Sequence, residues 1–468
     1  MDRRLEHTIL SIKFNAFQHG DGLPRSGLGG AAKMLPSKVS LYQYTLFKSD
    51  SGWGAGGRPK GLPMSDTKNG GQTGLVNGHS APGELVSTAP SPIRKTDVAI
   101  IGGGVAGSLA AAMLGRAGYS AVLIDLHKDF PRDFRCEKLD GGQIEVLLKT
   151  GLADAVFRAS TRTEKLWVVR SGTKLERAHN GECYFYYDML VNALRGEIPP
   201  SVDFIESRAD ALSTGPDRQT VTLANGETVS ARVVILANGL NLGLRQAIGI
   251  EREILSPCHS LSVGFDLAPA GGGGFRFPAL TYFPESRADR IAYLSLFPIG
   301  SVMRVNMFLY RDMKDPWLDR LREEPEKTLF AAMPGLKRYT GDFVATDKVK
   351  IRPIDLYVSK SFVRPGVVLV GDAYSTSCPA AGTGVTKALV DIERLCNTHI
   401  PKWLESDGMG VEKIAAFYED PVKVENEAYC LRKAFRLRAM TLQAGPYWRA
   451  RNWARSLVHI GTAAIQRT

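Results

Sequence analysis

A glycine-rich turn begins at residue 102, where the sequence reads Gly-Gly-Gly-Val-Ala-Gly between a β-branched run and an Ala/Leu-rich segment. In this GxGxxG spacing the first glycine permits a tight turn, the second lets the backbone approach a pyrophosphate, and the third lets a helix pack closely on a strand. The start of that helix would offer unpaired N–H groups to phosphates, and an acid about twenty residues later would bind a ribose. The pattern predicts dinucleotide contacts from Gly102, Gly104, Val105, Ala106, Gly107 and Asp125.

A second glycine-rich segment lies far downstream. The apolar run Val367–Val370 ends in Gly371-Asp372, and Pro379 and Gly382-Thr383-Gly384 then lead into another helical segment. This segment resembles the GDAxHxxxPxxGxGxN motif of the FAD-dependent monooxygenases related to p-hydroxybenzoate hydroxylase, whose relatives are geranylgeranyl reductases and flavin-dependent halogenases. A helix start near the flavin would stabilise the negative charge of its reduced form.

The resemblance assigns roles residue by residue. It implies that Asp372 binds the ribityl chain and that Pro379 lies over the reactive side of the isoalloxazine. It also implies flavin contacts from Gly371, Gly382, Thr383, Gly384 and Val385. Ser375 and Thr386 depart from the motif, since they stand where the family has His and Asn.

Further matches are weaker. The segment Ile235–Arg245 resembles the family's GADGxxSxVR segment, with Asn238 in place of Asp, and implies cofactor contacts from Asn238 and Gly239. Arg135 and Lys138 stand near the family's basic position and are candidates to neutralise pyrophosphate, with a solvated charge run as the alternative. Gln143 is a further candidate contact. Tyr187 stands where the family often has Arg.

Candidate catalytic residues come from two places. Pro379 and Cys378 lie in the second motif, and His259 and Tyr282 lie in segments with strand periodicity. The Cys, His and Tyr side chains could act as acid, base or hydrogen-bond donor, although ordinary packing is the competing interpretation of each. Cys136 and Cys378 could also bond covalently to a flavin. We expect no metal site, because the six cysteines are scattered without a CxxC pair.

These motifs require particular elements around them. Strand–helix–strand patterning surrounds the first motif, and period-2 strands run from about 258 to 312. We therefore expect an α/β fold: a three-layer FAD-binding dinucleotide fold, an antiparallel-sheet substrate domain and C-terminal helices. A single mixed-charge helix is expected over 316–332, and Asn225-Gly226 predicts a hairpin. The expected divisions are 95–160, 186–250 and 355–400 for FAD, 161–185 and 251–354 for substrate, 1–94 as a flexible extension, and 401–468 as a basic helical segment.

Charge is concentrated at the two ends of the chain. Of the net +11, residues 431–468 contribute +8 and residues 1–63 contribute +5, so the middle is slightly acidic. No nucleic-acid-binding module accompanies this charge, and we expect no nucleic-acid partner. We find no signal peptide or long apolar run and expect a cytoplasmic protein with reduced thiols, with Met64 as an alternative start.

The resemblance also implies an activity. Reduced FAD would react with oxygen to give a C4a-hydroperoxide that hydroxylates or epoxidises an apolar or aromatic small molecule, with NAD(P)H as the transient reductant. A halogenase is one alternative, although the WxWxIP segment is absent, and a geranylgeranyl-reductase-like double-bond reductase is another. A third is a flavin-binding protein at a membrane surface, because aromatic residues lie among the C-terminal arginines; a helix that caps the FAD domain competes with it. These aromatic residues are Phe435, Tyr447, Trp448 and Trp453.

Overall fold

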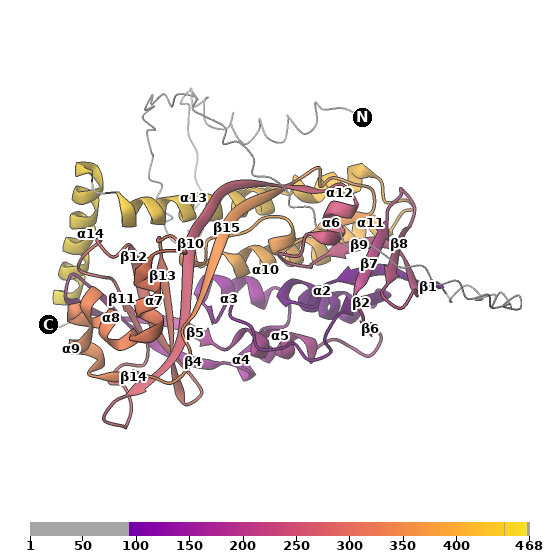
Figure 1. Cartoon of the computed structure of the whole chain (residues 1–468). Coiled ribbons are helices and arrows are strands. Elements are labelled where there is room, and N and C mark those ends of the chain that lie inside the picture. The colour runs from indigo at the N-terminus through magenta and orange to yellow at the C-terminus, as the bar shows by residue number, and fades with distance from the viewer. Residues whose placement is uncertain (1–92, 444, 466–468) are drawn as a thin grey trace, which may run out of the picture. The chain divides into compact units, whose positions relative to one another are not determined.

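The computed structural model describes residues 93–443 and 445–465, apart from the side chains of residues 179–180, 446–449 and 452. Two β-sheets and the helices packed around them make up this part of the chain (Figure 1). The predicted N-terminal extension falls outside the described residues except for Ile93 and Arg94, which begin the first strand.

The first sheet, which we call the nucleotide sheet, is mainly parallel. Its order is β6-β2-β1-β9-β8-β7, and β16 pairs with β9. Strands β6, β2, β1, β9 and β16 run parallel, whereas β7, β8 and β9 pair antiparallel, with the predicted Asn225-Gly226 turn between β8 and β9. The bounds are β1 (Ile93–Ile101), β2 (Ala121–Asp125), β6 (Asp203–Glu206), β7 (Ala209–Ser213), β8 (Gln219–Leu223), β9 (Thr228–Leu236) and β16 (Val367–Leu369).

Helices bury the parallel strands of the nucleotide sheet. Residues Val98–Ile100 of β1 and Val233–Leu236 of β9 are fully buried, as expected of strands that carry apolar side chains on both faces. Helix α2 packs against β1 and β2 and contacts α5 and α10. The helices from the first half of the chain are α2 (Val105–Arg116), α3 (Gly141–Leu148), α4 (Ala153–Arg158), α5 (Tyr187–Arg195) and α6 (Gly243–Ala247).

The second sheet, which we call the substrate sheet after the role expected from the sequence, has the order β14-β10-β13-β12-β11-β4-β5-β3, with β15 beside β10. All its pairings are antiparallel except that of β4 with β11. The predicted period-2 segments are present, and the long strands β10 and β15 widen the sheet. The bounds are β3 (Lys138–Leu139), β4 (Thr161–Arg170), β5 (Thr173–Tyr184), β10 (Glu251–Pro269), β11 (Leu280–Tyr282), β12 (Ile291–Ile299), β13 (Val302–Leu309), β14 (Phe343–Ala345) and β15 (Lys350–Lys360).

The single helix predicted over 316–332 is wrong. The segment forms two helices, because Pro325 lacks a backbone N–H and its ring obstructs a continuing helix, and Glu324 leaves helical geometry with ψ 66°. Both helices cover the core of the substrate sheet through residues such as Leu318 and Leu329. Their bounds are α7 (Pro316–Glu323) and α8 (Pro325–Ala332), followed by α9 (Lys337–Thr340).

The C-terminal part is helical, as expected. Helix α10 packs against α2, α3 and the long α13, and α14 packs against β5. Asp420 caps α13, with Pro421 in the first helical position. These elements are α10 (Gly384–Arg394), a π-helical turn (Leu395–His399), α11 (Ile400–Leu404), α12 (Val411–Tyr418), α13 (Pro421–Leu442) and α14 (Pro446–Ile465).

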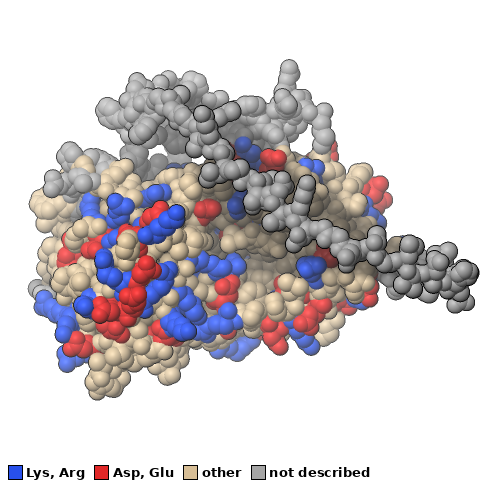
Figure 2. All heavy atoms as spheres, viewed as in Figure 1, with Lys and Arg blue, Asp and Glu red and all other residues tan. Residues whose placement is uncertain are grey.

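Two surface properties bear on partners. Within the described residues, no helix is both long enough and apolar enough to cross a lipid bilayer. On the face in Figure 2, basic and acidic side chains are interspersed over the described surface. A broad basic area of the kind that binds nucleic acid is therefore not visible on this face.

Candidate active site

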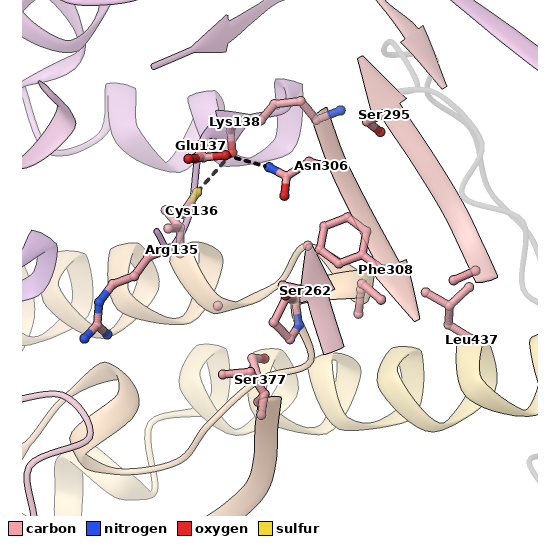
Figure 3. A pocket seen from close by; sticks show the side chains of 18 of the residues that line it. Arg135, Cys136, Glu137, Lys138, Ser262, Ser295, Asn306, Phe308, Ser377 and Leu437 are labelled. Atoms are coloured by element: carbon pink, nitrogen blue, oxygen red, sulfur yellow. Dashed lines mark hydrogen bonds between the residues drawn. The ribbon is translucent and has the colours of Figure 1, made fainter. Parts of the chain in front are cut away.

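A cavity of about 960 Å³ lies between the two sheets. Gly102, Asn238 and Val370, which follow the carboxyl ends of β1, β9 and β16, line one part of it. Thr281, Ser295, Asn306 and other residues of the substrate sheet line another part. Figure 3 shows side chains from both parts converging on this space.

The two glycine-rich turns lie side by side. In the nucleotide sheet, Ile101 and Leu369 are both register partners of Leu236, one on each side of it. Because parallel strands end at the same edge, the turns that follow Ile101 and Leu369 open onto the same cavity. Both motifs, far apart in the sequence, thus line one site.

The first turn depends on its glycines. Gly102 adopts φ +100°, and a Cβ there would lie 2.7 Å from the carbonyl oxygen of Ala237. A Cβ on Gly107 would lie 1.8 Å from the carbonyl oxygen of Gly102, so only glycine lets α2 approach the turn this closely. Gly104 is the N-cap of α2, and Gly104, Val105 and Ala106 line the cavity. The Val105 N–H points at the Tyr187 hydroxyl, 3.4 Å away. Position 187 is where the related monooxygenases often have Arg.

Asp125 lines the cavity and is held in place by its neighbours. Its Oδ2 accepts from the Gly103 N–H at 2.6 Å, and its Oδ1 accepts from Arg195 at 3.0 Å. Arg195 also donates to the Gly103 carbonyl at 2.6 Å and is nearly buried. A carboxylate oxygen can accept two hydrogen bonds, so Oδ2 keeps one acceptor position for a ribose hydroxyl. Sequence reasoning missed Arg195, which lies in a separate helix.

Gln143 connects the helix α3 to the second motif. Its side chain donates to the Gly382 carbonyl at 2.8 Å and to the Thr386 hydroxyl at 3.2 Å. Its Oε1 accepts from the Asp140 N–H in a capping box at the start of α3. Gln143 lines the cavity, as does Gly382, which has a left-handed φ of +64°. Thr386, a departure from the family motif, is thus a hydrogen-bond partner of Gln143.

Asp372 and Arg135 face each other across the cavity. Their closest side-chain atoms are 3.9 Å apart, and Arg135 also pairs with Asp133 at 2.5 Å. Desolvation raises the pKa of Asp372, while Arg135 opposes this rise. Both side chains line the cavity. Lys138 lines the cavity too, but its ammonium group pairs with Glu182 at 3.2 Å, so its role toward pyrophosphate stays a prediction.

A buried ionic network supports the second motif from behind. Lys387 donates to the Ser375 carbonyl at 2.9 Å and pairs with Glu427 of α13 at 2.9 Å. Asp391 of α10 accepts from the Gly371 N–H at 2.9 Å and pairs with the buried Lys423 of α13 at 2.6 Å. Ser375, the second departure from the motif, donates to Glu427. Helix α13 therefore anchors the loop that carries Asp372 and Pro379.

An orphaned polar atom shows that the site fits a nucleotide cofactor. The side-chain oxygen of Asn238 is buried on the cavity wall and has no hydrogen-bond partner. Buried acceptors are almost always paired, so this atom calls for a donor such as a ribityl or ribose hydroxyl. Gly239, next to it, adopts φ +57° and also lines the cavity. The remaining cofactor candidates that line it are Gly371, Gly384 and Val385, whereas Gly107 and Thr383 lie behind the wall.

The catalytic candidates divide into two groups. Pro379 lines the cavity, whereas Cys378, His259 and Tyr282 are buried outside its wall. His259 contacts Ser256 at 3.1 Å, and burial together with Arg438 lowers its pKa to about 4. Tyr282 donates to Glu285, and Cys378 contacts Ser260 at 3.5 Å. Burial raises the pKa of the Cys378 thiol, and it raises the pKa of Cys136, a cysteine that does line the cavity, to about 12, so both thiols stay protonated.

The substrate sheet presents two rows of side chains to the cavity. Register pairs Thr281 with Ser295 and Ser295 with Asn306, which forms a polar row across three strands. The neighbouring row is aromatic: the Phe283 and Tyr293 rings are 5.8 Å apart, and Tyr293 and Phe308 are 5.0 Å apart. All of them line the cavity. Their alternation was visible in the sequence, but which face meets the cavity was not.

A buried carboxylate closes the polar row. Glu137 accepts two hydrogen bonds from Arg304, at 2.8 and 2.9 Å. It accepts another from Asn306 at 3.2 Å, which Figure 3 shows. Arg304 also pairs with Asp266 at 3.0 Å. Burial raises the pKa of Glu137 to about 7 despite the guanidinium of Arg304. Glu137 is thus a titratable group on the cavity wall that sequence reasoning passed over.

Comparison with known proteins agrees with this geometry. Residues 95–400 match the family described as FAD binding domain. The chain belongs to this family. FAD is therefore its cofactor, and the resemblance read from the two glycine-rich motifs, together with the fold class, is confirmed.

Individual relatives are distant. Rat squalene monooxygenase is 24% identical over 331 residues, which cover 66% of this chain and 56% of the relative. The 3-demethoxyubiquinol 3-hydroxylase of Escherichia coli is 26% identical over 329 residues, 64% of this chain and 79% of the relative. The chain thus spans little more than half the length of the rat enzyme. The crystal structure of p-nitrophenol 4-monooxygenase from Pseudomonas putida shares the fold, with TM-score 0.63, 17% identity and coverage of 78% of this chain and 93% of that one.

Proposed function

We propose that this chain is an FAD-dependent monooxygenase that inserts one oxygen atom into an apolar or aromatic small molecule. NAD(P)H is the reductant, and the reaction consumes substrate, O₂, NAD(P)H and a proton to give oxygenated product, NAD(P)⁺ and water. The bound flavin supplies hydride acceptance and oxygen activation. The observation that carries the proposal is one continuous cavity whose wall holds both glycine-rich motifs and the aromatic row of the substrate sheet.

The residues of the chain have distinct tasks in this reaction. Gly102, Gly104 and the start of α2 hold the pyrophosphate, and Asp372 with Arg135 holds the polar chain of the flavin. Pro379 and Gly382 position the flavin ring against the substrate sheet. The aromatic row excludes water from the reacting atoms, which limits unproductive loss of oxidising equivalents. Glu137 holds or releases a proton at the cavity wall near neutral pH.

The decisive test uses labelled oxygen. The FAD-loaded protein is mixed with NAD(P)H and a panel of apolar and aromatic compounds under ¹⁸O₂, and products are analysed by mass spectrometry. One ¹⁸O atom in the product supports the proposal. Halide-dependent product in its place would indicate the halogenase alternative, and oxygen-independent saturation of a double bond would indicate the reductase alternative.

A second candidate property is contact with a membrane surface. On α14 the side chains of Trp453, Val458 and Ile465 are 67%, 70% and 75% exposed, whereas His459 is buried against the β4–β5 hairpin. Exposed apolar residues on a basic helix suit an anionic lipid surface. The full chain should cosediment with anionic vesicles but not with neutral ones, and the double variant Trp453→Ser/Val458→Ser should lose this binding. If α14 only caps the FAD domain, the chain should not sediment with either kind of vesicle.

The predicted division into domains and a cytoplasmic location belong to the same proposal. The segments 95–160, 186–250 and 355–400 would act together in FAD binding, and 161–185 with 251–354 would bind substrate. All six cysteines are unpaired, which suits a reducing compartment.

A further inference from the structure

Four arginines gather at one end of the cavity. Arg170 ends β4, Arg177 lies on β5, Arg287 follows β11 and Arg455 lies on α14, and all four line the cavity. Hydrogen bonds hold the β4–β5 turn against α14 and the loop after β11 against the end of α13. Ser171 and Ser456 are 2.9 Å apart, and Arg287 donates to the Gln443 carbonyl at 2.8 Å.

Two members of this cluster, Arg170 and Arg177, bear most directly on what this end of the cavity could bind. Among the described residues, no carboxylate lies within ion-pair distance of Arg170 or Arg177. The Arg170 guanidinium lies over the Phe283 ring, 3.5 Å from its centre. The carboxylate on this part of the wall, Glu285, accepts from Tyr282 and from the Gly335 N–H. Arg170 is partly buried, and a desolvated cation without a counter-charge is costly unless an anion joins it.

The same neighbours shift the pKa of Arg170. Burial, followed by repulsion from Arg455 and Arg177, lowers the pKa of Arg170 to about 10. An anion bound at the cluster would remove this repulsion, so the structure is poised for a negatively charged ligand.

The aromatic row connects the cluster to the flavin side of the cavity. Arg170 covers Phe283, which adjoins Tyr293, and Tyr293 adjoins Phe308. The Tyr293 hydroxyl donates to the Ala380 carbonyl at 2.8 Å, next to Pro379 in the second motif. Leu437 and Met440 of α13 line the same space. The cavity is thus cationic at one end, apolar along its length and adjacent to the flavin motif at the other end.

We propose that the substrate is an elongated amphiphile whose carboxylate or phosphate head binds Arg170 and Arg177 while its apolar chain lies along the aromatic row. This proposal rests on the proposed function, since it names the substrate class of the same site. Binding of the head group to the arginines fixes how far the apolar chain extends into the cavity. The carbon that reacts is therefore the one that lies beside Pro379, whatever the chemistry of the head group.

Binding without turnover tests the proposal. The oxidised FAD-loaded protein is titrated with dodecanoate, dodecyl phosphate, dodecan-1-ol and inorganic phosphate, and the flavin absorbance change is recorded with calorimetry as a second readout. We expect at least one of the two anionic amphiphiles to bind roughly tenfold or more tightly than the alcohol, as for charge-assisted hydrogen bonds, and the preference to shrink at high salt. The stronger of the two anions identifies the head group, and equal binding of all three amphiphiles overturns the proposal.

Substitutions locate the binding site. Arg170→Gln and Arg177→Gln should each remove most of the anion preference and leave alcohol binding unchanged, and Arg177 is exposed, so its substitution leaves the fold intact. Lys174→Gln is the matched control, because Lys174 lies over Trp167 on the other face of the same hairpin. A preference that survives both arginine substitutions contradicts the proposal.

Two further outcomes are decisive. If the arginine variants weaken NADPH binding in the absence of substrate and leave anion preference untouched, the cluster serves the reductant and the proposal is overturned. If the anionic amphiphile binds as expected but no ¹⁸O enters it, head-group recognition stands and the monooxygenase proposal fails.

Discussion

Gln143 donates a hydrogen bond to the Gly382 carbonyl at 2.8 Å, although the two residues are 239 positions apart. The bond joins the start of α3 to the loop that leads into α10. Since Gly382 lies on the cavity wall, Gln143 sets the position of a backbone segment that we propose the flavin contacts. A residue that caps α3 thus also shapes the proposed flavin site.

Gln143→Glu isolates this bond. Glutamate keeps the acceptor that caps α3 but cannot donate to the Gly382 carbonyl, so we expect FAD to bind about tenfold more weakly while the helix cap remains. Fluorescence titration of the apoprotein with FAD measures the change. Gln143→Leu should weaken FAD further and also lower the melting temperature; unchanged FAD affinity in both variants would contradict the role.

Asp372→Ala should remove most of the FAD affinity. The carboxylate lies in the cavity opposite Arg135, and loss of a charged hydrogen-bond partner costs roughly 1.5–3 kcal/mol, or about ten- to a hundredfold. Equilibrium dialysis of FAD gives the value. Asp217→Ala, at an exposed aspartate, is the control and should retain full flavin. Retention of wild-type affinity in Asp372→Ala would refute the site.

Gly107→Ala should disrupt the nucleotide sheet. The added Cβ would lie 1.8 Å from the Gly102 carbonyl oxygen, so α2 or the turn must move. We expect loss of FAD and destabilisation of several kcal/mol, in the range of severe overpacking. Gly141→Ala is the matched control, since nothing lies within 4 Å of its Cβ at the start of α3, and alanine there should be neutral or stabilising. Similar denaturation midpoints for the two variants would contradict the packing argument.

Glu137 predicts a pH-dependent contribution to stability. Its folded-state pKa of about 7 exceeds the ordinary value of 4.5, because burial outweighs the attraction of Arg304. The folded protein therefore keeps a proton that the unfolded chain releases, and this contribution to stability falls as pH rises from 4.5 to 7. Relative to wild type, Glu137→Gln should gain roughly 2 kcal/mol of unfolding free energy between pH 5 and pH 7.5.

Urea denaturation at the two pH values measures this gain. Glu323→Gln, at an exposed glutamate, should show no such change relative to wild type. Parallel pH profiles for wild type and Glu137→Gln would show that Glu137 is ionised throughout the range.

The sequence by itself determined the local elements and the class of cofactor. The glycines at 102, 104 and 107, the Gly371-Asp372 turn and the period-2 strands predict their own structure, because turns and strand faces follow from short-range sterics and patterning. Local patterning misleads at Pro325, because the mixed-charge pattern continues through this proline although the helix ends before it.

Only the tertiary structure decided which side chains share the cavity. Arg195 reaches Asp125, Gln143 reaches Gly382, and Glu137 meets Arg304 across 70, 239 and 167 positions of sequence. It also placed His259 and Tyr282 outside the cavity wall and gathered the four arginines at its end. Such contacts depend on strand order, register and the crossing of helices over the sheets. The residue pattern within one segment does not encode how far that segment lies from another segment in space.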